Sequence, residues 1–206
     1  MNLFGGGESA RVRWFEEKQR LMEAALGPIQ EGCVRMILGP GDRGPNATYF
    51  FQEHLSGTGM ATMELAPLKG RNASNSVYRK YELVTFTPGK VGQGADDLSD
   101  VANETPGGLL RGALAFIGAY AFDARLEPGN TIEFPDDFGM SMSGRAFVFD
   151  TYLPEKFSPS FGLMLLIEIH REEMAWAMEN NSAALIERLK QADVYPYSNI
   201  DRPTVV

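Results

Sequence analysis

The spacing of apolar residues predicts a first helix, a group of strands, a central helix, further strands and a helical C-terminal region. Residues 8–26 form the predicted first helix, capped by Ser9, and Gly27-Pro28 ends it because glycine accepts a left-handed cap and proline cannot continue the ladder. Strands are predicted over residues 33–38, 47–54, 60–67 and 78–86, which are rich in aromatic and β-branched residues. We expect the last three to form a meander.

The second half of the chain alternates between the same two patterns. Residues 107–122 combine large apolar residues with glycine and alanine, which predicts a central and mostly buried helix. Shorter strands are predicted over residues 130–134 and 145–151. Residues 161–169 are almost continuously apolar, as in an interior strand buried on both faces, and Leu165 should lie in the core. Residues 171–191 are helical in pattern, with a break at Asn180-Asn181 and Ser182 as a cap.

Two segments have no such pattern: residues 1–7, read as a flexible leader, and residues 88–106, read as a long acidic loop. The length of 206 residues fits one domain, or two small ones. We predict a single domain of α/β (α+β) class, with a mixed or largely antiparallel sheet packed with helices. The apolar runs are too short to span a bilayer, and the start of the chain lacks a signal-peptide pattern, so the predicted location is cytoplasmic.

Charge and cysteine content narrow the classes of partner. The formal net charge of −8 disfavours nucleic acid, whose binding depends on Lys and Arg at phosphates, and suits solubility or a basic protein partner. Cys33 is the only cysteine and is accompanied by two histidines, which leaves little material for a disulfide or a zinc site. No metal or cofactor is therefore predicted.

Two segments partly match known functional motifs, but both matches are incomplete. Residues 38–44 resemble a phosphate-binding loop but lack its Lys-Ser/Thr, and residues 170–174 resemble a zinc-protease motif but carry Met174 in place of the second histidine. We predict no catalytic residues and a structural role for His170. The alternative is an enzyme that uses His54 or His170 as a general base.

Short segments resemble the Suppressor of fused family in the same order along the chain: residues 26–29, 63–67, 81–85, 129–132, 161–174, 183–189 and 201–205. The resemblance implies a Suppressor of fused-like fold and a non-enzymatic protein-binding role. Bacterial relatives are thought to serve as immunity proteins, so the expected function is inhibition of a toxin. The alternative is an intracellular regulatory adaptor.

The resemblance also implies a binding surface, because the family's peptide groove lies near the turn that corresponds to Gly129, Asn130 and Thr131. The family often carries His or Asp where Asn130 stands. We expect a partner segment to add beside this turn as an extended strand or loop. Asp96, Asp97 and Asp100 would contribute electrostatic steering. The alternative is that the turn only reverses the chain and the acidic loop is only solvated.

Overall fold

A computed structural model of the protein describes residues 5–35, 45, 47–91, 105–138, 142–199 and 201–206. The helices in this part of the chain are α1 (Gly5–Leu26), α2 (Pro106–Ala121), the short 3-10 helix η3 (Pro154–Lys156), α3 (Arg171–Asn180) and α4 (Ser182–Gln191). The strands are β1 (Ile29–Arg35), β2 (Ala47–Phe51), β3 (Thr58–Ala61), β4 (Tyr81–Thr87), β5 (Thr131–Glu133), β6 (Ala146–Tyr152) and β7 (Gly162–Ile169).

The seven strands form one mixed sheet in the order β1-β2-β3-β4-β7-β6-β5. β1 to β4 are antiparallel neighbours in sequence, so the predicted meander is confirmed and gains one strand. β4 and β7 are parallel, and α2, β5 and β6 lie between them in the sequence, because a parallel pair needs a long crossover. β7, β6 and β5 are again antiparallel.

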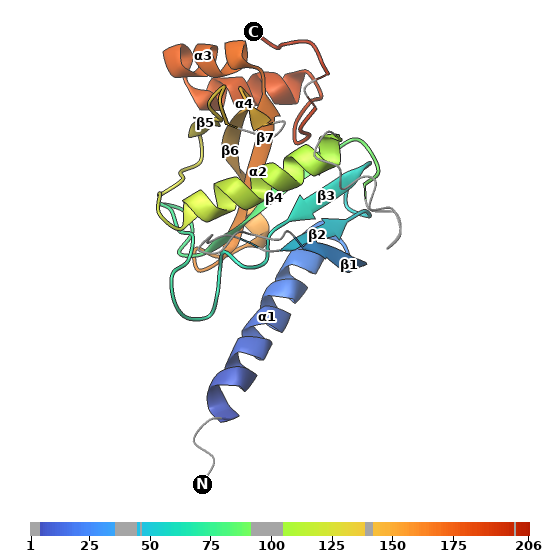
Figure 1. Ribbon diagram of the computed structural model, residues 1–206, viewed down its shortest axis with the longest axis vertical. Helices are drawn as coiled ribbons and strands as arrows, with labels where there is room; N and C mark the ends of the chain where they lie inside the picture. Colours follow the sequence, from blue (N-terminus) through green and yellow to red (C-terminus); the bar gives the residue numbers. More distant parts are fainter. Residues whose placement is uncertain (1–4, 36–44, 46, 92–104, 139–141, 200) are drawn as a thin grey trace.

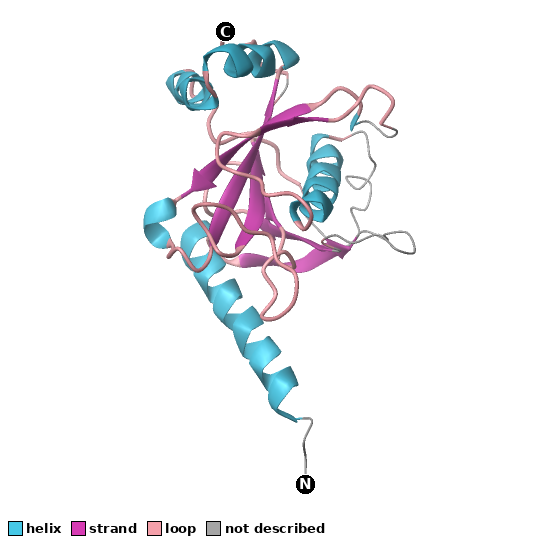
Figure 2. Ribbon diagram, turned by 90° about the vertical axis from the view of Figure 1, so that its left-hand side faces the viewer, coloured by secondary structure: helices cyan, strands magenta, loops and turns pink. Residues whose placement is uncertain are grey.

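Helices cover both faces of this sheet, with α2 on one face and α1, α3 and α4 on the other (Figures 1 and 2). β7 shows the consequence, because successive side chains of a strand point to opposite faces. Leu163, Leu165 and Ile167 pack in the core with α1, α3 and α4. Met164 and Leu166 pack in the core beneath α2. The apolar run of residues 161–169 is therefore an interior strand, as predicted, and the chain is a single α+β domain.

α2 lies close against its surroundings because small residues leave room. A Cβ added at Gly118 would lie 2.7 Å from the ring of Pro45, and one added at Gly107 would lie 2.7 Å from Val91. Thr105 caps the helix by accepting a hydrogen bond from the Gly108 N–H at 3.1 Å. The predicted buried central helix is thus present.

Several predicted boundaries differ from the observed ones. α1 begins at Gly5, so it includes the last three residues of the expected leader 1–7 and places Ser9 inside the helix. β1 begins at Ile29, directly after Pro28, and α2 begins at Pro106, the last residue of the expected loop 88–106. The predicted strand over residues 60–67 ends at Ala61.

The C-terminal helices break where predicted, but the cap is a different residue. The side chain of Asn181 accepts a hydrogen bond from Ala184 N at 2.7 Å, whereas Ser182 is the first residue of α4. Asn and Ser are both strong caps, so the residue that acts as the cap depends on the exact position at which α4 begins.

Candidate functional site

The turn at Gly129, Asn130 and Thr131 leads into β5. Gly129 has φ +85°, which favours glycine, and its N–H donates to Phe149 O at 2.7 Å. Asn130 N donates to Glu127 O at 3.0 Å, and Asn130 Oδ1 accepts from Glu127 N at 2.9 Å. The Asn130 side chain therefore closes the turn from within, as Asn often does.

β5 is an edge strand, since β6 is its only neighbour in the sheet of the described residues. Asn130 O accepts a hydrogen bond from Phe149 N, and Phe134 N donates one to Arg145 O. Asn130 and Phe134 therefore direct their backbone groups toward β6. Backbone groups alternate in direction along an antiparallel strand, which places those of Thr131 and Glu133 on the outer side. Such an edge can accept another extended segment.

An aromatic patch lies beside this edge on the face covered by α2, and we define it as Phe116, Tyr120, Ile132 and Phe138. The rings of Phe116 and Phe138 are edge to face with centroids 5.1 Å apart. Tyr120 follows Phe116 by one helical turn and is 51% exposed. Ile132 and Phe138 are partly buried against the core beneath α2. An apolar side chain of an added strand would find contacts here.

Charged residues flank the edge on the opposite face. Arg171, the first residue of α3, forms ion pairs with Glu133 and with Asp136, the latter at 2.8 Å. A Cβ added at Gly129 would lie 3.8 Å from Ser182 Cβ, so the start of α4 borders the turn. The free edge of β5 thus runs between an apolar and a polar wall.

The structure brings the predicted turn residues to this edge but does not place the predicted acidic residues. Asp96, Asp97 and Asp100 lie outside the described residues. The sequence reasoning missed the aromatic patch, although Phe116 and Tyr120 stand four residues apart on the predicted helix. Residues four apart lie on the same side of a helix, but two aromatic residues also fit a buried helix, so their spacing alone did not indicate a surface patch.

Both histidines have structural partners. The Nε2 atom of His54 is 2.7 Å from the Tyr152 hydroxyl, and burial together with nearby Lys156 lowers the pKa of this ring. His170 donates from Nε2 to Arg202 O at 2.9 Å, which agrees with the structural role predicted for it. Neither ring is hydrogen-bonded to a carboxylate in the described part of the chain.

Glu173 ties the C-terminal segment to α3. Its buried carboxylate accepts two hydrogen bonds from Arg202, both at 2.6 Å, and one each from the backbone N–H groups of His170 and Val205, both at 2.9 Å. Burial disfavours the charged form of Glu173, but the hydrogen bonds outweigh burial, and its pKa is lowered.

We expect Glu173→Gln to flatten the loss of stability in acid. A carboxyl group whose pKa is lowered by folding stabilises the protein above its unfolded-state pKa, and this contribution is lost as the pH falls through the folded-state pKa. Urea denaturation between about pH 7 and about pH 3 measures the slope, which Glu173→Gln should reduce and Glu179→Gln, an exposed change on the same helix, should leave unchanged. Equal acid slopes for wild type and Glu173→Gln would contradict this role.

The described residues contain no group of three or more His, Cys, Asp or Glu side chains placed to hold a metal ion. Among the helices that the structure describes, none has the length and apolar character needed to cross a membrane.

No family model and no curated relative matches the sequence. Solved structures do match its fold. The chain in the crystal structure of the Sufu–Fu complex has a TM-score of 0.60 at 13% identity, over 95% of this chain and 91% of that one. A proposed Suppressor of fused homologue from Neisseria gonorrhoeae FA 1090 has a TM-score of 0.54 at 12% identity, over 97% and 98%.

These similarities define the class of the protein: an α+β domain built on a mixed sheet. More particularly, it has a Suppressor of fused-like fold, as the sequence predicted.

Proposed function

We propose that the protein is a non-enzymatic protein-binding domain of the Suppressor of fused family and that it binds an extended segment of its partner along β5. The observation that carries this proposal is the free edge at Thr131 and Glu133, bordered by the aromatic patch. An added strand would gain backbone hydrogen bonds from the edge and side-chain contacts from the patch. The presence of a chain of the same fold in the Sufu–Fu complex supports a protein partner.

The partner is a toxin, and the protein is an immunity-type inhibitor. The net charge of −8 supports this assignment, because an acidic inhibitor associates faster with a basic target. Steering by Asp96, Asp97 and Asp100 remains a prediction. Co-expression with a toxin encoded beside its gene tests the assignment: the protein should restore growth, and no rescue would leave the adaptor role ahead.

We expect Thr131→Pro to weaken partner binding at least about tenfold, which corresponds to about 1.4 kcal/mol. Proline removes the outward N–H of Thr131 and places a ring where an added strand would lie. The fold should change little in stability, since proline is tolerated on edge strands where the N–H faces outward. Surface plasmon resonance measures the affinity of each variant for the toxin that the protein neutralises in the co-expression test.

One further variant is a control for this test, and another tests the aromatic patch. Thr131→Val keeps the N–H and the β-branched shape, so its affinity should match that of wild type. Tyr120→Ala removes an exposed ring of the aromatic patch without altering the edge, and it should also weaken binding. Unchanged affinity for both Thr131→Pro and Tyr120→Ala would move the binding surface away from β5.

A further inference from the structure

The parallel strands β4 and β7 separate before they end. They pair only over Tyr81–Val84 and Gly162–Leu165, although β4 continues to Thr87 and β7 to Ile169. The C-terminal segment fills the first part of this gap. Ser198 N donates to Phe86 O at 2.7 Å, and Glu168 N donates to Ser198 Oγ at 2.9 Å.

Beyond Ser198 the gap opens into a cleft of about 590 Å³. Its walls are Thr87 at the end of β4 and residues 88–91 after it, residues 105–107, 109 and 110 at the cap and first turn of α2, Arg145, Glu168 and residues 198, 199 and 201. The chain leaves β4 toward α2 on one face of the sheet and leaves β7 toward α3 on the other. Open α/β sheets hold ligands at such points, outside the carboxyl ends of parallel strands whose connections diverge.

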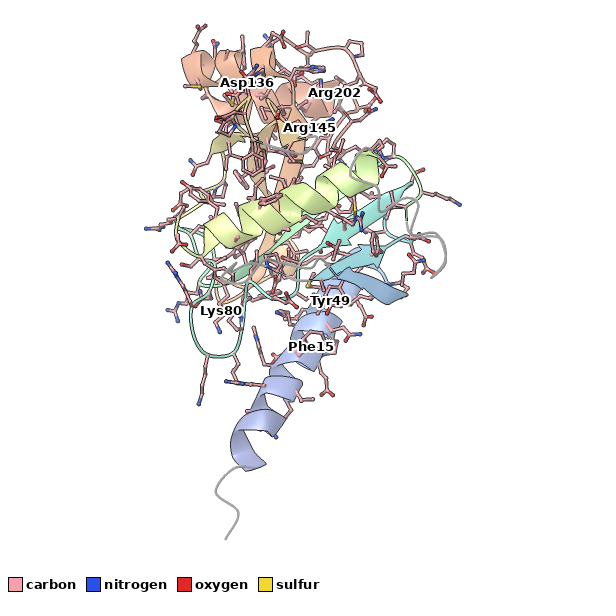
Figure 3. All side chains as sticks on the ribbon, viewed as in Figure 1. Phe15, Tyr49, Lys80, Asp136, Arg145 and Arg202 are labelled. Atoms are coloured by element: carbon pink, nitrogen blue, oxygen red, sulfur yellow. The ribbon has the colours of Figure 1, made fainter. Side chains whose placement is uncertain are left out.

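Arg145 and Glu168, which form an ion pair, both line the cleft. Figure 3 shows the labelled Arg145 between α2 and the C-terminal helices. Glu168 is only 5% exposed, and Arg145 bonds its Oε1 atom. No described residue donates a hydrogen bond to Oε2, and Asp201 stands at the rim. Burial raises the pKa of Glu168 and Asp201 adds to the rise, while Arg145 and His170 oppose it without cancelling it.

An anion does not suit this site, although α2 begins there. Thr105 already accepts the hydrogen bond of Gly108 N, and the carboxylates of Glu168 and Asp201 repel negative charge. Arg145 is paired with Glu168, and Lys90 is exposed at the rim. A ligand with several N–H donors and a positive charge can donate a hydrogen bond to Glu168 Oε2 and balance the charges of both the Glu168 and the Asp201 carboxylates.

We propose that this cleft takes up a basic side chain, arginine or lysine, of an extended partner segment, with the cation bonded to Glu168 Oε2 and Asp201. The inference rests on the proposed function in one respect, since the side chain would belong to the protein partner. It concerns a site separate from β5, because Glu168 and Asp201 line the cleft at the ends of β4 and β7.

The test uses a probe peptide in place of the partner. Acetylated and amidated Val-Arg-Val is titrated into the labelled protein, and amide shifts are followed by NMR at Thr87, Gly107 and Glu168. The control peptide carries citrulline, which has the shape of arginine without its charge. We expect saturable shifts with a Kd on the order of 1 mM or below for the arginine peptide, and none for the citrulline peptide.

Three variants distinguish binding of the peptide in the cleft from general attraction of a cationic peptide to an acidic protein. Glu168→Gln keeps an acceptor for Arg145 and should reduce the affinity for the arginine peptide at least about tenfold. Asp201→Asn, at the exposed rim, should weaken it less and does not risk the fold. Glu17→Gln removes the same charge from α1, at the other end of the molecule in Figure 3, and should leave binding unchanged.

The inference is overturned if the cleft amides do not shift, if the citrulline peptide binds equally, or if Glu168→Gln binds like wild type. None of these results bears on strand addition at β5, which Thr131→Pro tests with the whole partner. Failure of the cleft and failure of the proposed function are therefore distinguishable.

Discussion

Lys18→Met is expected to destabilise the protein by roughly 3–5 kcal/mol, because it leaves a buried carboxylate without its cation. Lys18 Nζ lies 2.6 Å from Glu82 Oε1, and both side chains are almost fully buried. The same ammonium donates to Met63 O at 2.5 Å. The pair therefore fastens α1 to β4 and to the segment after β3.

Glu82 keeps other donors when Lys18 is removed, and they fix where the remaining charge stays. Thr62 Oγ1 at 2.7 Å and the backbone N–H groups of Leu65 and Ala66, both at 3.0 Å, donate to the carboxylate. These bonds hold the charge in place but do not neutralise it, so methionine in place of Lys18 leaves it buried and uncompensated.

Guanidinium denaturation of wild type and Lys18→Met measures the effect. Arg20→Met is the matched control, since it replaces an exposed cation on the same helix and should change stability by no more than about 0.5 kcal/mol. If Lys18→Met costs less than about 1 kcal/mol, the pair does not stabilise the attachment of α1.

Leu165→Ala is expected to cost roughly 2–5 kcal/mol. Leu165 is 0% exposed in the middle of β7, paired with Val84 on one side and Asp150 on the other. Its side chain packs in the core with α1, α3 and α4. Truncation removes buried apolar surface and leaves a cavity that an interior strand, held on both sides, can close only in part.

The same denaturation measurement tests this variant. Met178→Ala is the control, because Met178 is 74% exposed on α3 and its truncation creates no cavity. A cost below about 1 kcal/mol for Leu165→Ala would show that the core tolerates the loss by collapse.

The candidate site could be predicted from the sequence only in part. Residues 129–131 were placed by resemblance, and the structure puts them at the start of an edge strand. The aromatic patch joins Phe116 and Tyr120 of α2 to Ile132 and Phe138 from a later part of the chain. Sequence spacing does not report which side of a helix meets which strand.

The cleft at Glu168 depends still more on tertiary structure. Its walls come from five separated parts of the chain, and it exists because β4 and β7 stop pairing after Val84 and Leu165. A strand pattern indicates that residues 161–169 form a strand, but it does not indicate where a parallel neighbour diverges. A glutamate within an apolar run is the one local signal that Glu168 required a partner.

The sequence by itself determined the helices, most strands and the buried position of Leu165, because apolar periodicity and turn residues act over a few positions. The Suppressor of fused-like fold was predicted from the family resemblance of short segments, not from periodicity. Only the tertiary structure decided the order of the strands, the end of β3 at Ala61 and the partners of Glu82. Residues after Ala61 turn away from the strand path and donate hydrogen bonds to the buried carboxylate of Glu82, and the need of this carboxylate for hydrogen bonds outweighs their β propensity. Long-range electrostatics of this kind depends on distances in space that local patterns do not contain.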